Sequence, residues 1–198
     1  TGQVLALDST TEITVTATDG AGNDSSDTFN VTVSDATAAT ISCPDDVTAE
    51  ATSSDGADVD YDAATATDAG ATPVDSDVAI AYTAASGSTF AIATTTVTAT
   101  STDDSNNQST CDFTVTVSDN TGPSINVPDN VTAEATSPDG ATAQYNAASA
   151  SDAVDDDVTI TYSKASATPF ALGETTVTVT AEDNYENTST ATFTVTVS

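Results

Sequence analysis

The feature that most constrains this chain is its internal repetition. Residues 41–68 recur as residues 125–152, with 18 of 28 positions identical. The segment 100–118 recurs as 180–198, and a further copy of that segment stands earlier, at 16–34. Self-similarity at a period of about 80 residues indicates a tandem array of like modules, each a unit of structure.

The repetition predicts where the modules meet. Seams fall at Ser34–Asp35 and Ser118–Asp119, so we expect the latter half of a repeat at 1–34 and full repeats at 35–118 and 119–198. The half-repeat carries too few strands to cover a core. It is either a slice of a longer array or a module whose missing strands come from another subunit.

Within each repeat, Thr alternates with Val or Ala, as in 95–100, 175–180 and the FTVTV segments. A period of two is typical of half-buried strands, and Asp, Asn, Gly and Pro clusters supply turns between them. No segment has helical periodicity. We therefore predict an all-β fold of tandem immunoglobulin-like β-sandwich repeats, with about six or seven antiparallel strands in each.

The charge of the chain limits its partners and its chemistry. The sequence has 31 acidic residues and one basic residue, Lys164, with no Arg and no His. Such a polyanion repels nucleic acid and anionic membrane surfaces, and no apolar run is long enough for insertion into a bilayer. Without imidazole bases or guanidinium clamps we expect no enzyme. The partners that the charge favours are divalent cations, and the alternative is simple solubility at high salt.

Two cysteines bracket the second repeat. The third repeat has Val127 and Ala191 where the second has Cys43 and Cys111, so both cysteines are replaced together. Joint replacement predicts that the two sulfurs form a disulfide, with two buried free thiols as the alternative. A disulfide implies an oxidising compartment, hence a secreted or cell-surface protein.

Several short motifs, in this order and spacing, resemble the hyalin-repeat (HYR) family. Ile41-Ser42-Cys43-Pro44 opens a repeat, Phe90 precedes a Thr/Val strand, and Asp103 to Asn107 lie ahead of Cys111-Asp112-Phe113. Asp119 to Ile125 resembles the family's inter-repeat start. The resemblance implies extracellular immunoglobulin-like modules of adhesive, matrix and microbial surface proteins, without enzymatic activity. Where the family commonly has Trp, this chain has Tyr61 and Tyr145.

These features favour a structural or adhesive array, a segment of a long surface fibre, stalk or filament, whose partners are neighbouring repeats or like subunits. The alternative is a ligand- or glycan-recognition module of a large adhesin. Its binding surface would lie at the one loop that differs between the repeats, Gly70 to Asp77 in the second and Val154 to Asp157 in the third, because loops commonly carry recognition.

Five N-x-S/T sequons predict glycosylation. Those at Asn23, Asn107 and Asn187 occupy one hairpin tip in every repeat, whereas Asn30 and Asn130 lie elsewhere. The alternative is that Asn is simply a favoured turn residue.

Acidic and amide side chains at the seams predict calcium, whose ligands are carboxylate, amide and carbonyl oxygens. We expect Asp35, Asp119 and Asn120 to be ligands. Because the hairpin lies at the far end of the last strand from the seam that follows it, the other ligands should come from loops. The loop candidates are Glu50–Asp55, Glu134–Asp139, Asp68, Asp75, Asp77, Asp152 and Asp155.

The hairpin acids Asp19, Asp103 and Asp183 are instead expected to cap their own turns. Calcium at Asp35 and Asp119 would stiffen each junction. The alternative is a seam that is rigid through packing of Pro123 and Ile125 alone.

Overall fold

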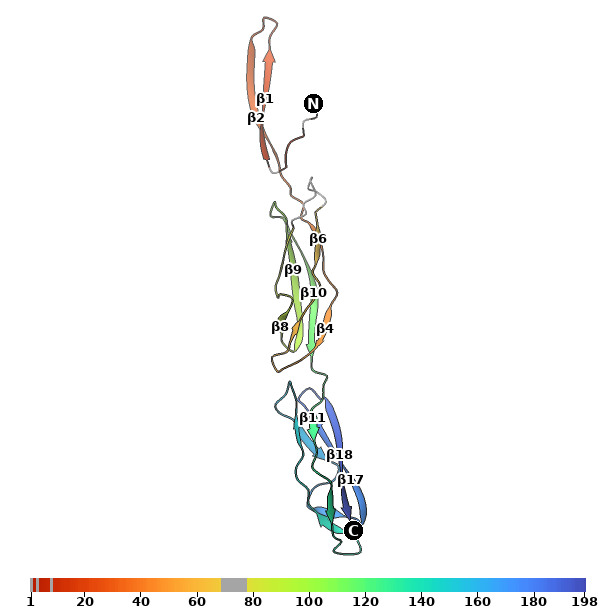
Figure 1. The fold of residues 1–198 in the computed structure, drawn as a ribbon. Coiled ribbons are helices and arrows are strands. Elements are labelled where there is room, and N and C mark those ends of the chain that lie inside the picture. Colours follow the sequence, from red (N-terminus) through yellow and green to blue (C-terminus); the bar gives the residue numbers. More distant parts are fainter. Residues whose placement is uncertain (1, 3, 8, 69–77) are drawn as a thin grey trace. The chain divides into compact units, whose positions relative to one another are not determined.

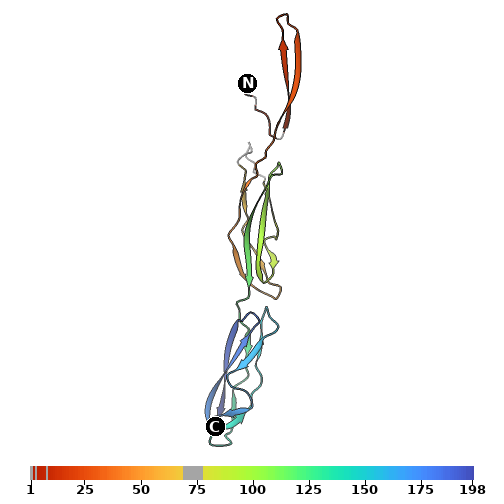
Figure 2. The ribbon, with the colours of Figure 1, turned by 180° about the vertical axis from the view of Figure 1, so that it is seen from behind.

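The computed structural model describes residues 2, 4–7, 9–68 and 78–198, and this part of the chain consists of strands joined by turns, without a helix (Figures 1 and 2). Accordingly, no described helix has the length and apolar character needed to cross a membrane. The all-β prediction is confirmed.

Contacts divide the chain into two compact units, each assembled from three segments. The first unit comprises Thr1–Asp46, Asp60–Ser86 and Thr96–Thr114. The second unit comprises Val47–Val59, Gly87–Thr95 and Val115–Ser198.

Thr alternates with apolar residues in the long strands of both repeats, and the short strands are more varied. Those of residues 1–118 are β1 (Ser9–Thr18), β2 (Asp24–Val33), β3 (Thr40–Ser42), β4 (Val47–Glu50), β5 (Ala57–Val59), β6 (Thr65–Thr67), β7 (Ala79–Tyr82), β8 (Ser88–Phe90), β9 (Ala93–Thr102) and β10 (Gln108–Ser118). Those of residues 119–198 are β11 (Ser124–Asn126), β12 (Val131–Ala133), β13 (Ala141–Ala143), β14 (Ser149–Ser151), β15 (Thr159–Tyr162), β16 (Thr168–Phe170), β17 (Gly173–Glu182) and β18 (Thr188–Val197).

The half-repeat forms one antiparallel hairpin of β1 and β2, with Ser9 opposite Val33 and Thr18 opposite Asp24. Its side chains Val15 and Phe29 are 56% and 53% exposed. Phe113 and Phe193, the counterparts of Phe29, are buried at 3%. The hairpin therefore has the strands of a repeat's end without the core that those strands cover elsewhere.

Each full repeat is built on a four-stranded sheet, in the order β4-β10-β9-β7 or β12-β18-β17-β15. The long hairpins within these sheets are antiparallel, as expected, but β4 pairs with β10 and β12 with β18 in parallel. An entirely antiparallel sandwich was therefore wrong in this detail. Parallel pairing needs a long connection, and here most of the repeat separates the two strands.

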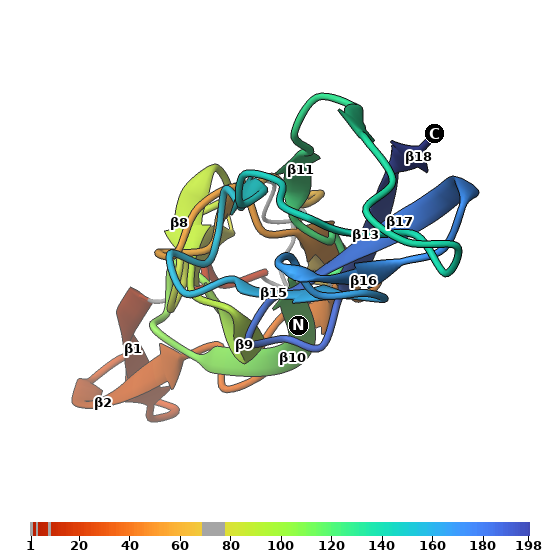
Figure 3. The same ribbon diagram turned by 90° about the horizontal axis from the view of Figure 1, so that it is seen from below.

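Three-residue strands complete each repeat. They form the antiparallel pairs β3–β6 and β5–β8 in the second repeat and β11–β14 and β13–β16 in the third. Figure 3 shows β13 and β16 side by side. These short strands make eight in the described part of each full repeat, rather than six or seven.

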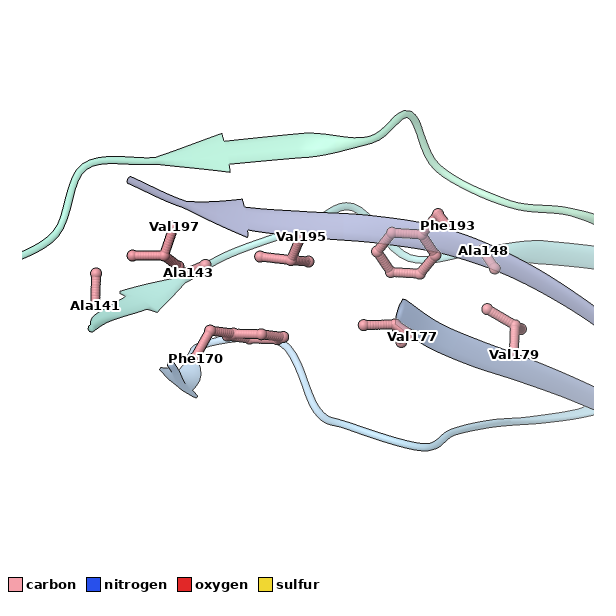
Figure 4. Close-up of a cluster of buried hydrophobic side chains, with 9 residues drawn as sticks. All are labelled: Ala141, Ala143, Ala148, Phe170, Val177, Val179, Phe193, Val195 and Val197. Carbon is pink, nitrogen blue, oxygen red and sulfur yellow. The ribbon is translucent and has the colours of Figure 1, made fainter. Parts of the chain in front are cut away.

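The core of the third repeat lies between β17, β18 and the short strands (Figure 4). Val195 and Val197 alternate with outward-facing Thr on β18, and Phe170 lies opposite them with no exposed surface. Tyr145 packs edge-on against Phe193 with ring centroids 4.8 Å apart, as Tyr61 does against Phe113. Tyrosine therefore serves as a core aromatic where the family commonly has Trp.

The predicted disulfide is present. Cys43 and Cys111 are bonded with their Cα atoms 5.7 Å apart, and the described residues contain no free cysteine. The bond connects the segment that follows β3 to strand β10, within the first unit.

Candidate cation sites

Three carboxylates converge in the first unit. Oxygens of Asp35, Asp68 and Asp103 all lie within 4.8 Å of one another. Asp68 is 2% exposed and Asp103 is 6% exposed, whereas Asp35 is half-buried. Each residue directly follows a strand or lies within two residues of its end. Asp35 lies at the seam that opens the repeat, Asp68 in the loop after β6, and Asp103 in the hairpin turn after β9.

The hairpin turn fixes Asp103 in this cluster. Its Oδ1 accepts the backbone N–H of Asn107 at 2.8 Å, and its Oδ2 accepts the Asn107 side-chain amide at 3.0 Å. The same amide also donates to the backbone carbonyl of Asp35 at 3.3 Å. Asp103 therefore caps its own turn, as expected. The asparagine of that turn, Asn107, also connects it to the seam through the hydrogen bond to the Asp35 carbonyl.

The presence of Asp103 in this cluster corrects the expectation that a hairpin acid stays apart from seams. The long strand β10 does separate Asp103 from the seam that ends its own repeat, at Asp119, as expected. The structure brings Asp103 instead to the seam that opens the repeat, at Asp35. Antiparallel reversal between β9 and β10 makes this possible, because the hairpin tip returns to the end of the repeat where the chain entered.

The third repeat places its corresponding acids with the same contacts. Asp183 Oδ1 and Oδ2 accept the Asn187 backbone N–H at 2.8 Å and side-chain amide at 3.0 Å. That amide also donates to the carbonyl of Asp119 at 3.2 Å. Asp119 and Asp183 are each 6% exposed. Asp152, the counterpart of Asp68, follows β14 and is half-buried.

The environment of Asp119 opposes its negative charge. Burial raises the pKa of this carboxyl, the Thr121 backbone N–H lowers it, and the charges of Asp152, Asp183 and Glu50 raise it further. Oδ1 accepts the Thr121 N–H at 3.1 Å. Oδ2 is buried and has no hydrogen-bond donor among the described residues.

Asn120, a predicted ligand, donates hydrogen bonds to Glu50. Its backbone N–H and side-chain amide donate to the two carboxylate oxygens of Glu50, at 2.7 and 2.9 Å, and the Thr121 hydroxyl donates to Glu50 Oε1 at 2.7 Å. These hydrogen bonds, with those of Asn120 largest, hold the pKa of Glu50 below its ordinary value. The sequence predicts Glu50 only as one end of a candidate loop. It does not predict the hydrogen bonds from Asn120 to Glu50, because the two residues are 70 positions apart.

The remaining predicted ligands either form hydrogen bonds within the protein or lie outside the described residues. Asp155 Oδ2 and Oδ1 accept the Asn184 backbone N–H at 2.6 Å and its side-chain amide at 3.0 Å, and hydrogen bonds from Asp157 and Asn184 lower the Asp155 pKa. In the loop Glu134–Asp139, the backbone N–H of Asp139 donates to Ser137 Oγ at 3.2 Å. The variable loop Gly70 to Asp77, with Asp75 and Asp77, lies outside the described residues.

The sequon asparagines differ in their surroundings. Asn23 is exposed and its amide donates only to Asp19 Oδ2 among the hydrogen bonds described, at 2.8 Å. Asn107 and Asn187 are half-buried, and the amide nitrogen of each donates hydrogen bonds to the hairpin acid and to the carbonyl of the seam acid. Asn130 Oδ1 accepts the Thr194 N–H at 2.9 Å, and Asn30 lies exposed on β2. Glycosylation of these residues stays a prediction, with Asn23 the most accessible hairpin site.

Chemically, clustered carboxylates with nearby backbone carbonyls suit hard divalent cations, above all calcium, which takes six to eight oxygens. The clusters contain no imidazole, because the sequence has no His, and the single basic side chain, Lys164, lies over the Phe170 ring.

Comparison with known proteins finds distant structural likenesses. No curated protein sequence matches it. Among solved structures, Drosophila N-cadherin EC1-4 is 18% identical (TM-score 0.39; 98% of this chain and 58% of that chain). Mouse cadherin-23 EC22-24 is 13% identical (0.37; 96% and 74%). Protocadherin gamma B2 cadherin domains 3-6 are 15% identical (0.35; 96% and 57%), so this chain spans little more than half of that structure.

The family assignment rests on the sequence itself. The HYR domain profile matches residues 34–117 and again residues 118–197, which together make up most of the chain. The two matches meet beside the seam at Ser118–Asp119, where the internal repetition also begins again. The chain therefore belongs to the HYR domain family, with two tandem copies of the domain.

Proposed function

We propose that this chain is a non-enzymatic, extracellular structural or adhesive protein, a segment of a long surface fibre, stalk or filament. The observation that carries the proposal is the direct succession of HYR modules, with about five residues between the last strand of one and the first strand of the next. In this proposal the modules have the bounds 1–34, 35–118 and 119–198, and the partners are neighbouring repeats and like subunits.

The composition supports the same role. A disulfide suits an oxidising, extracellular location. The negative charge disfavours binding to nucleic acid and insertion into membranes. The absence of His and Arg from the sequence removes the side chains most used for general base catalysis and phosphate binding, which supports a non-enzymatic role.

Electron microscopy of the native material tests the proposal. Fibres or stalks with a repeating substructure are expected, and labelling with an antibody against the second repeat should decorate them. Isolated monomers on the surface would contradict the assignment to a filament and favour the alternative.

A ligand- or glycan-recognition module is the second candidate, and one observation favours it. A surface hollow of about 450 Å³ in the third repeat is lined by Tyr145, Ala147, Thr161, Tyr162, Ala165 and Ser166. Tyr145 and Tyr162 are half-buried, and the parts of their rings that line the hollow offer an apolar surface on which a sugar ring could pack. Saturable binding on a glycan array that is lost in Tyr162→Ala but kept in Tyr185→Ala, an exposed tyrosine outside the hollow, would support this candidate.

We further propose that calcium binds at the seams through Asp35 and Asp119 and stiffens the junctions. The convergence of Asp35, Asp68 and Asp103 within 4.8 Å supports this. Small-angle scattering of the full chain, with calcium and with chelator, provides the measurement. Calcium should increase the maximum dimension and the melting temperature, and if neither changes, calcium has no part in the architecture.

A further inference from the structure

We propose that Asp119, Asp152 and Asp183 together bind one divalent cation of the hard, oxygen-preferring class, calcium being the expected ion, at a site separate from Asp35, Asp68 and Asp103. This rests on the proposed function and deepens it, because it replaces the seam pair Asp119 and Asn120 by a ligand set drawn from the seam, a loop and the hairpin.

The first step is the balance of charge. Asp119 and Asp183 are each 6% exposed, and both lie in a chain with one basic side chain. That side chain, Lys164, has its Nζ 4.5 Å from the centroid of the Phe170 ring, within the core region of the repeat. Burying a carboxylate is unfavourable unless hydrogen bonds or an ionic partner compensate its charge. Lys164 is the only basic side chain and lies at Phe170, so within the described part of the chain no basic side chain is placed at these two acids, and a cation from solvent would offset their charge.

The second step is the orphaned oxygen. Asp119 Oδ2 is buried and receives no hydrogen bond from the described residues, although Oδ1 does. Buried polar atoms without a partner are rare in folded proteins, and such an atom is a candidate to contact a bound water or ion. The charges that act on Asp119 come from Asp152, Asp183 and Glu50, all acids. An oxygen with acids around it and no donor has the surroundings of a cation ligand.

The third step is the correspondence with the other cluster. Asp119 and Asp152 stand 84 residues after Asp35 and Asp68, and Asp183 stands 80 residues after Asp103, the registers of the internal repeat. The hairpin asparagine makes the same three contacts in both copies, two to the hairpin acid and one to the carbonyl of the seam acid. The hydrogen bonds between the hairpin and the seam are thus reproduced in the third repeat, although among the described residues only the carboxylates of Asp35, Asp68 and Asp103 all lie within 4.8 Å of one another.

Glu50 explains why Asn120 is not in the ligand set. Both amide groups of Asn120 point their N–H bonds at the Glu50 carboxylate. These hydrogen bonds hold the nitrogen of the Asn120 amide against Glu50, and the proposed site does not need the Asn120 Oδ1, because the three carboxylates supply the charge that balances a cation. Each carboxylate of the proposed set can give one or two oxygens, and water completes the coordination.

The chain contains its own control for the hairpin. Asp19 makes the same turn, with Oδ1 accepting the Asn23 N–H at 2.9 Å and Oδ2 accepting the Asn23 amide at 2.8 Å. Asp19 is exposed, however, so a substitution there removes the turn's acid without touching the buried cluster.

Equilibrium dialysis of the full chain against calcium, after removal of metal by a chelator, tests the assignment through the number of ions bound. Asp152→Asn is the main variant, because asparagine keeps the Oδ1 that accepts the Val154 N–H at 2.8 Å. It should bind one calcium ion fewer than the wild-type chain, whereas Asp19→Asn and Asn120→Ala should bind as many as the wild type. Asp183→Asn should also lose one ion, and circular dichroism identifies any variant that fails to fold.

The outcomes separate this inference from the proposal on which it rests. If the wild type binds calcium but Asn120→Ala loses an ion while folded Asp152→Asn and Asp183→Asn do not, calcium belongs to the seam pair and this ligand set is wrong. If an ion is lost only on Asp68→Asn, the third repeat has no site and this ligand set is wrong. If the wild type binds no calcium at millimolar concentration, the calcium part of the proposed function fails as well.

Discussion

Replacing the cysteines with the residues that the third repeat has at the same positions isolates the contribution of the disulfide. The double variant Cys43→Val, Cys111→Ala adopts the pair Val127 and Ala191, which this fold already accommodates. The packing change is therefore small, and the loss of the cross-link dominates. The bond joins residues 68 apart in sequence. On the chain-entropy model a loop of that length contributes about 4 kcal/mol to the free energy of unfolding.

The expected shift is large enough to resolve by calorimetry. For a module of this size, each kcal/mol moves the melting temperature by about 4–8 °C, so the second repeat should melt about 15–30 °C lower in the double variant. The third repeat has no disulfide and its transition should stay in place, which makes it an internal reference. Wild-type protein treated with a reducing agent should reproduce the variant's curve.

A small effect would refute this reasoning. If the double variant loses less than about 1 kcal/mol, the disulfide does not restrict the unfolded chain in the way that the entropy model assumes. If both repeats lose stability together, the repeats unfold as one cooperative unit and the internal reference fails. Denaturant titration of the same samples separates these two results, because a merged transition has a steeper dependence on denaturant.

Two further predictions concern single contacts. Gly140 has φ +118°, and an added Cβ would lie 1.9 Å from the Phe170 carbonyl oxygen, so Gly140→Ala should destabilise the third repeat by at least about 2 kcal/mol in denaturant unfolding. Gly20→Ala, where nothing lies within 4 Å, should leave stability unchanged, and equal effects of the two would contradict the steric argument. For Glu50, the hydrogen bonds from Asn120 lower the pKa of the folded state, so the stability they give is present above the ordinary pKa of 4.5 and is lost as pH falls through the lowered value. Titration of its side chain by NMR should give a midpoint below 4.5 that returns toward it in Asn120→Ala, and an unchanged midpoint would mean that the contact is absent in solution.

Much of the fold was predictable because its signals are local. Alternation of Thr with Val gave the long strands, and β17 and β18 contain the predicted segments, extended by a few residues at their ends. The pairing of Cys43 with Cys111 was also predictable, since repetition within one chain shows which residues change together. What failed was strand direction: nothing in the residues of β4 shows that it lies parallel to β10. That choice depends on the path of the intervening chain.

The candidate sites were predictable only in part. Seam acids and hairpin acids stand out in the sequence, and the turn-capping role of Asp103 follows from local chemistry. Their convergence with Asp68 does not, because it depends on three strand ends meeting in space. The hydrogen bonds from Asn120 and Thr121 to Glu50 could not be predicted either, since an exposed glutamate at the end of a short strand has no local sequence signature.

By itself, the sequence determined that the chain is a polyanionic tandem array of β-modules, one of them closed by a disulfide, because composition, period and alternation can be read directly from the order of the residues. Only the tertiary structure decided which acids lie close together, and that Asp119 Oδ2 has no hydrogen-bond donor among the described residues. The physical reason is that a charge cluster is set by distances between residues far apart in the chain. Those distances follow from strand register and from the reversal of each hairpin, here the one that returns Asp183 to the carbonyl of Asp119 through Asn187.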